Sequence, residues 1–233
     1  MFEDLHWFGL EWREGPDCGG PFAPYNQSER LDFYRRALRQ LIAAGFIFHC
    51  TCSRKDIQQA AQAPHAEEEE PIYPGTCRAH HAEASSENKT GSNFSLRFRV
   101  PDGETISFVD RRLGEQKFVA GKDFGDFVVW RPDEVPSYQL ACVVDDSAMQ
   151  ISEVVRGADL LVSTARQILL YRALGMAAPD FFHCPLVCDE AGVRLAKRHE
   201  SLSLRSLRQR GVTAESLRSQ DSNAASQSFQ TGS

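Results

Sequence analysis

The stretch from residue 151 to residue 175, ISEVVRGADLLVSTARQILLYRALG, constrains the fold of this chain more than any other. Its apolar start predicts a strand, and its second half predicts a helix that is capped by Ser163 or Thr164 and ends at Gly175. A strand, a loop and a helix in this order form half of a parallel α/β unit. The sequence therefore predicts an α/β fold.

Arg156 stands where this predicted strand meets its loop. Ligands bind at the carboxyl ends of strands in open parallel sheets, and an arginine there can hold a carboxylate or a phosphate by two hydrogen bonds. An ion pair with Asp159 that ties down the loop is an equal alternative. Tyr138, in PSYQLA, is a second candidate, although its residue type alone favours a core tyrosine with a satisfied hydroxyl. The apolar run 137–146 does not distinguish a helix from a strand.

Residues 26–46 give the clearest helix pattern in the chain. Asn26 and Glu29 form a start that resembles a capping box, and Gly45 supplies the stop. An apolar stripe predicts the buried face of this helix: Leu31, Tyr34, Leu38 and Leu41. Residues 1–12 also predict a helix, which runs into a turn.

The middle of the chain predicts a small antiparallel insertion. Residues 94–100, FSLRFRV, alternate apolar and polar side chains, which is typical of a half-exposed strand. The segments ISFVD and GDFVVWR are expected to be its neighbours.

Three of the seven cysteines lie close together in the sequence, as Cys50, Cys52 and Cys77. Cysteines at i and i+2 of an extended segment place both sulfurs on one side. Three converging thiolates are typical of a closed zinc site that needs a fourth ligand, whereas the alternative is a strand whose cysteines bind no metal. Side chains that can supply the fourth ligand are Tyr73, His49, His80 and His81.

The chain carries a net charge of -6, which argues against a uniformly basic surface for nucleic acid. Basic residues nevertheless gather near its end, with a single anion, Glu200, among them. This group indicates a polyanionic partner, and its alternative is a solvated turn. Its members are Arg194, Lys197, Arg198, Arg205, Arg208 and Arg210. No run is apolar and long enough for a membrane span, and no leader pattern opens the sequence, so we expect a cytoplasmic protein without a disulfide framework.

Five blocks, in this order, resemble the class I glutamyl-type aminoacyl-tRNA synthetases. They are GPFAPYNQSERLDFY, CTCSRKDI…IYPGTCR, PSYQLACVVDD, EVVRGADLLVSTARQILLYRALG and HCPLVCDEAGVRLAKRH. The resemblance spans most of residues 5–210 and comes closest to a short branch of the family that attaches glutamate to queuosine in tRNA(Asp). It implies a ligase with a Rossmann-like core that uses L-glutamate, tRNA(Asp) and ATP with Mg²⁺, and that is a monomer.

The same resemblance implies roles for individual residues. Tyr138 and Arg156 match the tyrosine and arginine that bind glutamate. The KMSKS loop that binds ATP falls on Arg194, Leu195, Ala196, Lys197 and Arg198, with Lys197 as the catalytic lysine that stabilises charge on the triphosphate and with Ala196 in place of a serine. The Zn²⁺ ligands of the short branch fall on Cys50, Cys52, Tyr73 and Cys77.

One departure from the family is large, because the HIGH signature and its strand have no counterpart in this sequence. We therefore expect an N-terminally incomplete core that is poorly soluble and forms no adenylate by itself. Residues 1–48 and 132–218 are predicted to form the catalytic core, residues 49–131 an inserted zinc-bearing α+β subdomain that binds the acceptor, and residues 219–233 a disordered tail. The alternatives are a fragment of a glutamyl-tRNA synthetase that charges tRNA(Glu), and a non-catalytic zinc-bearing module that binds RNA.

Overall fold

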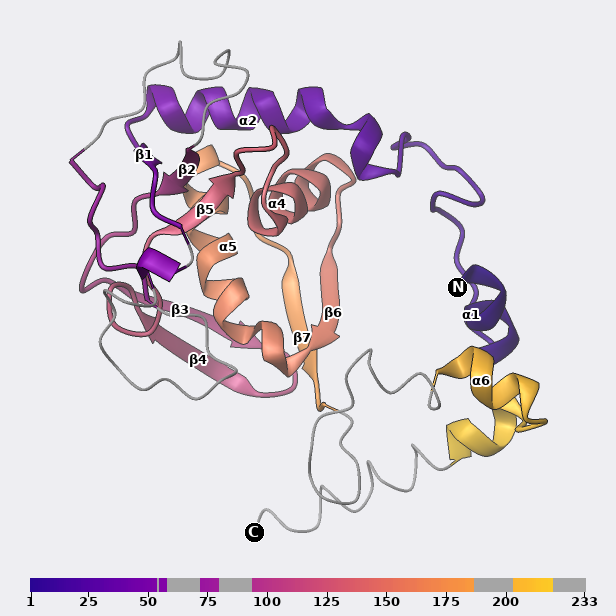
Figure 1. Ribbon diagram of the computed structural model, residues 1–233. Coiled ribbons are helices and arrows are strands. Elements are labelled where there is room, and N and C mark those ends of the chain that lie inside the picture. Colours follow the sequence, from indigo (N-terminus) through magenta and orange to yellow (C-terminus); the bar gives the residue numbers. More distant parts are fainter. Residues whose placement is uncertain (54, 58–71, 80–93, 187–202, 220–233) are drawn as a thin grey trace, which may run out of the picture. The chain divides into compact units, whose positions relative to one another are not determined.

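The computed structural model describes residues 1–53, 55–57, 72–79, 94–186 and 203–219 (Figure 1). This part of the chain forms two compact units, a large central one and a small one built from both ends of the sequence. Within it, no helix is long and apolar enough to cross a membrane.

The large unit, Asn26–Pro185, contains two sheets (Figure 1). The first is antiparallel, with the strand order β1-β2-β5. The second is mixed, with the order β4-β3-β7-β6, since β3 and β4 pair antiparallel whereas β7 runs parallel to both β3 and β6. The strands are β1 (Ile47–Cys50), β2 (Ser95–Phe98), β3 (Thr105–Asp110), β4 (Gly114–Val119), β5 (Phe127–Trp130), β6 (Glu153–Gly157) and β7 (Asp180–Cys184).

The predicted neighbours of β2 are half confirmed. The strand in GDFVVWR, β5, lies beside β2, but the strand in ISFVD, β3, lies in the other sheet, so its predicted place beside β2 is wrong. β3 forms a hairpin with β4, a strand that the sequence patterns did not indicate because its exposed side chains include charged ones. Hydrogen bonding to β7 then takes the hairpin into the sheet that carries Arg156.

β2 is fully buried, so the predicted half-exposed strand is wrong. The reason lies in Arg97, whose guanidinium packs 4.2 Å from the centre of the Tyr73 ring. Its Nη1 donates a hydrogen bond of 2.9 Å to the carbonyl oxygen of Asp126. An arginine with an aromatic and a carbonyl partner can be buried on the face where alternation predicts solvent.

Three helices pack with these sheets. The helix expected near residue 26 begins at Leu31, after a single turn of 3-10 helix in which the Asn26 amide donates to Glu29 rather than capping the helix. Gly45 follows its end with φ of 77°, which confirms the predicted stop. The elements are η1 (Gln27–Glu29), α2 (Leu31–Ala43), α4 (Tyr138–Ala148), η3 (Ala158–Leu160) and α5 (Leu161–Leu174).

α4 resolves the ambiguous run as a helix, with the Ser137 side chain accepting a hydrogen bond from the backbone of Leu140. α5 confirms the predicted helix and its stop, since Gly175 is left-handed with φ of 66°. The predicted caps are wrong: α5 begins at Leu161, and Ser163 and Thr164 lie buried in its first turn. Their hydroxyls accept hydrogen bonds inside the unit instead, Ser163 from Gln139 at 3.0 Å and Thr164 from Arg156 at 2.6 Å.

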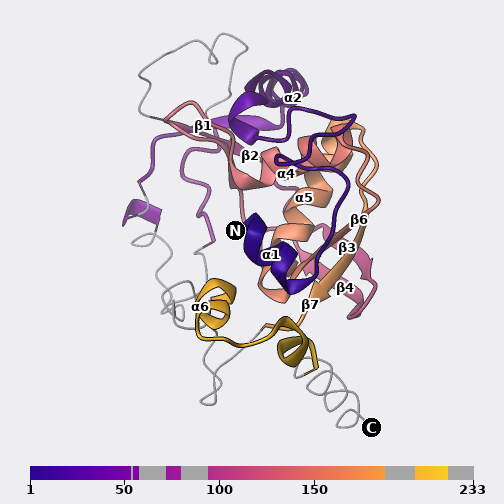
Figure 2. The same ribbon diagram turned by 90° about the vertical axis from the view of Figure 1, so that its right-hand side faces the viewer.

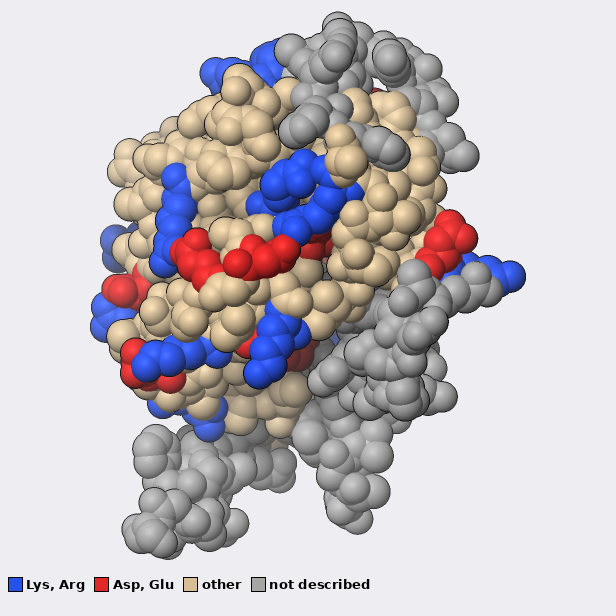
Figure 3. Space-filling view, turned by 90° about the vertical axis from the view of Figure 1, so that its left-hand side faces the viewer, with Lys and Arg blue, Asp and Glu red and all other residues tan. Residues whose placement is uncertain are grey.

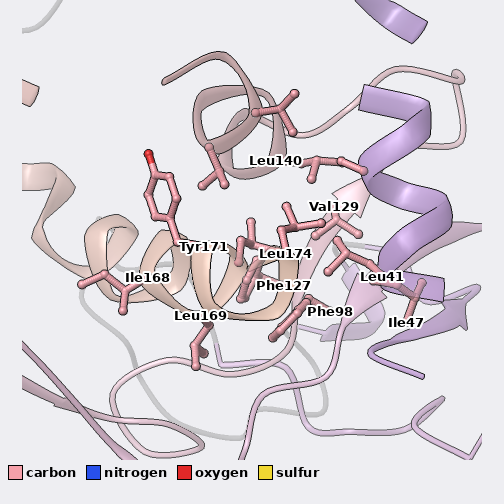
Figure 4. Packing of buried hydrophobic residues seen from close by; sticks show 14 of the residues in the cluster. Leu41, Ile47, Phe98, Phe127, Val129, Leu140, Ile168, Leu169, Tyr171 and Leu174 are labelled. Atoms are coloured by element: carbon pink, nitrogen blue, oxygen red, sulfur yellow. The ribbon is translucent and has the colours of Figure 1, made fainter. Parts of the chain in front are cut away.

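The core of the large unit lies where the helices meet the first sheet (Figure 4). Leu41 of α2, Leu140 of α4 and Leu174 of α5 converge there with Phe98 and Phe127. In Figure 2 the second sheet runs along one side of α4 and α5, with β1 and β2 on the other side. Buried apolar surface on both sides of α5 thus fixes the sheet that carries the carboxyl end of β6.

A buried carboxylate ties α2 to α4. Asp145 accepts hydrogen bonds from Arg30 Nε at 2.6 Å, from the Tyr34 hydroxyl at 2.9 Å and from Gln27 Nε2 at 2.9 Å. The charge is therefore paired as well as buried, which offsets the cost of removing it from water.

The small unit contains α1 (Phe2–Phe8), which confirms the predicted N-terminal helix, and α6 (Leu204–Gln209). Asp4 of α1 accepts hydrogen bonds from Arg205 of α6 at 3.2 and 3.3 Å. Arg208 approaches Asp4 at 3.4 Å and Glu3 at 3.8 Å. Acidic side chains of α1 thus partner two of the six basic residues that the sequence grouped as a polyanion-binding cluster.

Candidate functional site

Arg156 and His183 lie side by side at the carboxyl ends of two parallel strands. They are direct partners in the register of β6 and β7, so their side chains stand on the same face of the second sheet. The N-terminal turn of α5 and the start of α4 supply the remaining side chains of this cluster. The arrangement confirms the expectation that Arg156 stands at the carboxyl end of a parallel strand.

The guanidinium group of Arg156 makes four hydrogen bonds. Nη2 donates to Thr164 Oγ1 at 2.6 Å and to Gln167 Oε1 at 2.8 Å. Nε donates to His183 Nε2 at 3.3 Å, and Nη1 donates to the Tyr138 hydroxyl at 3.4 Å. These contacts fix the plane of the guanidinium, because they use three of its nitrogens at once.

Tyr138 is 50% exposed, so it is not the core tyrosine that its residue type alone favoured. Burial of its hydroxyl raises the pKa of Tyr138, which keeps the phenol protonated at neutral pH. The hydroxyl oxygen accepts from Arg156, and a hydrogen bond with Cys142 also raises the pKa of Tyr138. A ligand can receive the hydroxyl proton in place of Cys142. Tyr138 and Arg156 together therefore present N–H and O–H donors that suit a carboxylate.

Sequence reasoning missed a buried pair behind Arg156. His183 is fully buried and Asp110 is 1% exposed, and His183 Nδ1 lies 2.7 Å from Asp110 Oδ2. Asp110 also accepts hydrogen bonds from the backbone amides of Arg112, Leu113 and His183. Burial by itself raises the pKa of Asp110, but the hydrogen bonds from His183 and these amides outweigh it and lower that pKa. A histidine inside the apolar run FFHC was the available signal.

The second cluster consists of Cys50, Cys52, Tyr73 and Cys77. The three sulfurs lie within 4.8 Å of one another. Cys52 Sγ lies 3.6 Å from Cys77 Sγ, and the Tyr73 hydroxyl lies 3.4 Å from Cys50 Sγ and 3.8 Å from Cys52 Sγ. The structure thus brings together all four residues that the resemblance assigned to a metal.

These separations match the edges of a metal-binding tetrahedron. With bonds of about 2.3 Å to sulfur and about 2.0 Å to oxygen, a tetrahedral zinc ion separates two sulfurs by about 3.8 Å and a sulfur and an oxygen by about 3.5 Å. The measured separations of 3.6, 3.4 and 3.8 Å lie close to these values. Three thiols and a phenol at such distances fit a tetrahedral metal ion with affinity for sulfur.

The pKa values of the clustered thiols diverge. Burial raises the pKa of Cys52 to about 11. Although burial opposes it, hydrogen bonds from Tyr73 and Thr51 lower the pKa of Cys77 to about 6. Cys77 is therefore the thiol most readily present as a thiolate, which is the form that binds metals.

Local contacts hold the loops of this cluster. Ser53 and Asp56 exchange side-chain hydrogen bonds with each other's backbone amides, at 2.7 and 3.2 Å, just after the Cys52 position. Next to Cys77, Arg78 bonds to Asp102 and to the buried carboxylate of Asp126. The turn that brings Tyr73 to Cys77 uses Gly75 with φ of 80°, a conformation that favours glycine.

A cavity of about 710 Å³ borders both clusters. Cys52 and Tyr73 line one part of it, and Tyr138 lines another. Its polar lining includes three cations and two hydroxyls: Arg97, Arg131, Arg166, Ser95 and Ser137. The cavity therefore gives a polar ligand access to the Tyr138 side chain.

Basic side chains of the described residues lie next to acidic ones on the face that Figure 3 draws. Figure 3 shows Lys and Arg interspersed with Asp and Glu on one face of the molecule, and the contacts include the pairs Arg172–Glu104 and Lys117–Glu115. The predicted ATP loop, Arg194, Leu195, Ala196, Lys197 and Arg198, lies outside the described residues.

Comparisons with known proteins agree on one family. The profile of "tRNA synthetases class I (E and Q), catalytic domain" matches residues 1–220. A Glutamyl-Q tRNA(Asp) synthetase of Symbiobacterium thermophilum is 50% identical over 216 residues, which are 92% of this chain and 66% of that protein. The protein of the same name from Nitratidesulfovibrio vulgaris is 47% identical, and the alignment covers 93% of this chain and 67% of that protein. The chain thus spans about two thirds of the length of these relatives.

More distant relatives carry a second name. Glutamate--tRNA ligase 1 of Halorhodospira halophila is 41% identical, over 93% of this chain and 46% of that ligase. Among solved structures, a glutamate tRNA ligase from Elizabethkingia meningosepticum, crystallised in complex with its amino acid, matches with a TM-score of 0.68 and 31% identity. That match covers 84% of this chain and 41% of the ligase.

Proposed function

The chain belongs to the class I tRNA synthetases of the glutamate and glutamine type, and we propose that it serves in the ATP-dependent activation of L-glutamate and its transfer to queuosine of tRNA(Asp). The observation that carries the proposal is the fixed guanidinium of Arg156 beside the Tyr138 hydroxyl, at the carboxyl end of β6. The 50% identity to a Glutamyl-Q tRNA(Asp) synthetase supports this substrate over other carboxylates.

Arg156 and Tyr138 bind a carboxylate of glutamate in this proposal. The arginine supplies charge and the phenol supplies a directed O–H donor, and both are held in place before the ligand arrives. Ligand binding then requires little ordering of these side chains, which favours affinity.

The reaction has two steps. A carboxylate oxygen of glutamate attacks the α-phosphorus of ATP, and the bond to the departing pyrophosphate breaks. A hydroxyl of the modified nucleoside then attacks the activated carbonyl carbon, and AMP leaves. No protein nucleophile is needed, since positioning and electrostatic stabilisation supply the catalysis. Lys197, in the loop Arg194 to Arg198, supplies the positive charge opposite the triphosphate in this scheme.

Zn²⁺ is the metal that the four residues Cys50, Cys52, Tyr73 and Cys77 hold in this proposal. Support comes from separations that match a tetrahedron and from a donor set of three sulfurs and one oxygen. All four positions are protein ligands, so the ion is structural and orders the loops that border the cavity beside Tyr138.

Transfer of labelled glutamate tests the proposal. Because the HIGH signature has no counterpart in the sequence, the test uses a version of the protein that carries a HIGH-bearing segment upstream of residue 1. It is incubated with ATP, labelled glutamate and one of three acceptors: tRNA(Asp) that contains queuosine, the same tRNA without queuosine, or tRNA(Glu). Label is expected on the first acceptor alone, and Arg156→Ala should abolish it whereas the surface variant Arg172→Ala should not.

Two results would overturn the proposal in different ways. Label on tRNA(Glu) would identify the second candidate function, that of a glutamate–tRNA ligase. The 41% identity to such an enzyme is the observation that favours this candidate. Absence of glutamate-dependent exchange between ATP and pyrophosphate would identify a non-catalytic RNA-binding module.

A further inference from the structure

A buried ionisable pair lies directly behind the proposed ligand-binding arginine. His183 and Asp110 are both essentially inaccessible to solvent, and their closest atoms, Nδ1 and Oδ2, are 2.7 Å apart. Burying such groups costs free energy unless each atom is paired. Asp110 is fully paired, with three backbone amides in addition to the imidazole.

The hydrogen bonds assign one tautomer to His183. Asp110 requires a hydrogen on Nδ1, because a carboxylate only accepts. Two groups face Nε2: Thr164 Oγ1 at 3.0 Å and Arg156 Nε at 3.3 Å. A hydroxyl can accept or donate, but Arg156 Nε can only donate, so Nε2 offers its lone pair to that side. A hydrogen on Nε2 would point at the N–H of Arg156, and the two donors would repel each other. The carboxylate of Asp110 thus makes the imidazole an acceptor for Arg156.

The other donors of Arg156 are almost all committed. Its two Nη2 hydrogens reach Thr164 and Gln167, and one Nη1 hydrogen reaches Tyr138 over the longer distance of 3.4 Å. Of the five N–H groups of the guanidinium, one on Nη1 has no acceptor among the residues that the structure describes. The one N–H of the guanidinium left for a ligand therefore lies on Nη1, the nitrogen that bonds to Tyr138.

We propose that His183 and Asp110 are positioning residues that hold Arg156 so that only Nη1, together with the Tyr138 hydroxyl, meets the glutamate carboxylate. The proposal rests on the proposed function for the identity of the ligand. It replaces the two-pronged grip expected from the sequence by an end-on contact through one nitrogen and one hydroxyl. His183 acts through Arg156 and does not touch the substrate.

Two variants of His183 test the hydrogen bonds of its two ring nitrogens separately. The amide nitrogen of His183→Asn can take the place of Nδ1 and keep the bond to Asp110, but it offers no acceptor to Arg156. The amide oxygen of His183→Gln can take the place of Nε2 and accept from Arg156, while the three backbone amides still pair Asp110. Thermal unfolding of both variants checks that each is folded.

Two measurements on the whole protein compare the variants with the wild type. Titration calorimetry gives the affinity for glutamate, and proton NMR gives the exchange rate of the Arg156 Nε hydrogen, which does not depend on any ligand. His183→Asn should weaken glutamate binding about tenfold and speed this exchange, whereas His183→Gln should stay within about threefold of wild type in both.

Equal losses in the two variants would overturn the proposal and make His183 a packing residue. Wild-type affinity and slow exchange in His183→Asn would overturn it as well. A wild-type protein that binds no glutamate would overturn the proposed function and the ligand assigned here, and the exchange rates would still decide whether His183 positions Arg156.

Discussion

The two polar clusters of the large unit are built in opposite ways. The cysteine cluster takes all its members from residues 50–77, on one strand and two adjacent loops. The Arg156 cluster takes its members from five elements, β3, α4, β6, α5 and β7, which spread from Asp110 to His183. The first is local in the sequence, and the second exists only when two sheet pairings have formed.

The clusters also differ in how their polar groups are satisfied. In the Arg156 cluster the arginine, the histidine and the aspartate each meet a partner of opposite character, so they pair with one another without a further ion. In the cysteine cluster three sulfurs face one another, and burial opposes the charge of any thiolate among them. Such a group gains from a cation, whereas the arginine cluster gains from an anion. The same fold thus prepares neighbouring sites for ligands of opposite charge.

The largest expected effect comes from removing one sulfur. Cys77→Ala should reduce bound zinc from about one ion per chain to almost none, because only two of the three sulfur ligands remain and the lost thiol is one whose pKa is lowered to about 6. Elemental analysis of the purified protein measures this, with Cys142→Ala as the matched control, a cysteine outside the cluster. Zinc retained by Cys77→Ala, or absent from the wild type, would contradict the assignment.

Removing the arginine should affect the other cluster alone. Arg156→Ala should weaken glutamate binding about 100-fold, because it removes the charged donor that lies beside the Tyr138 hydroxyl. Arg156→Lys should restore only part of this, since an ammonium cannot bond to His183, Thr164 and Gln167 in one plane. Calorimetry measures both, and Arg172→Ala is the control. A loss of glutamate affinity below threefold would contradict the role of Arg156 in binding. A loss of zinc from Arg156→Ala would show that the two clusters are not independent.

The pH dependence of the free energy of unfolding tests the hydrogen bonds of Asp110. Its pKa is lowered in the folded protein from the ordinary value of 3.8, so its contribution to stability is present above that value and is lost as the pH falls through the folded pKa. Asp110→Asn should lower the free energy of unfolding by about 2 kcal/mol at pH 7, with a smaller difference below about pH 4. Urea unfolding at several pH values measures this. A difference that stays constant with pH would mean that the charge of Asp110 plays no part.

The smallest effect is expected at the phenol. Tyr73→Phe should lower zinc affinity about tenfold and leave the stoichiometry intact at saturating zinc, because three sulfurs remain and water can fill the fourth position. Competition with a chromophoric chelator measures the affinity. Unchanged affinity would assign the fourth ligand to one of the histidines near the cysteines in the sequence, His49, His80 or His81.

The sequence by itself predicted several features that depend on neighbouring residues, although not the helix caps. The helices α2 and α5 and their glycine stops follow from a 3.6-residue period and from a backbone conformation that glycine adopts freely. The cysteines and Tyr73 lie within residues 50–77, and they predicted a cluster that the fold does assemble. Arg156 was recognised because the end of a parallel strand is a known place for a ligand.

Only the tertiary structure decided what depends on distant partners. Strand pairing is not local, so the position of β3 beside β7 rather than β2 could not be read from its own residues. The burial of Arg97 required Tyr73 and Asp126 to be in place. His183 looked like one more residue of a buried strand until the sheet set it between Asp110 and Arg156. The physical reason is the same in each case: a buried polar side chain is defined by the groups that pair with it, and the fold alone brings those groups together.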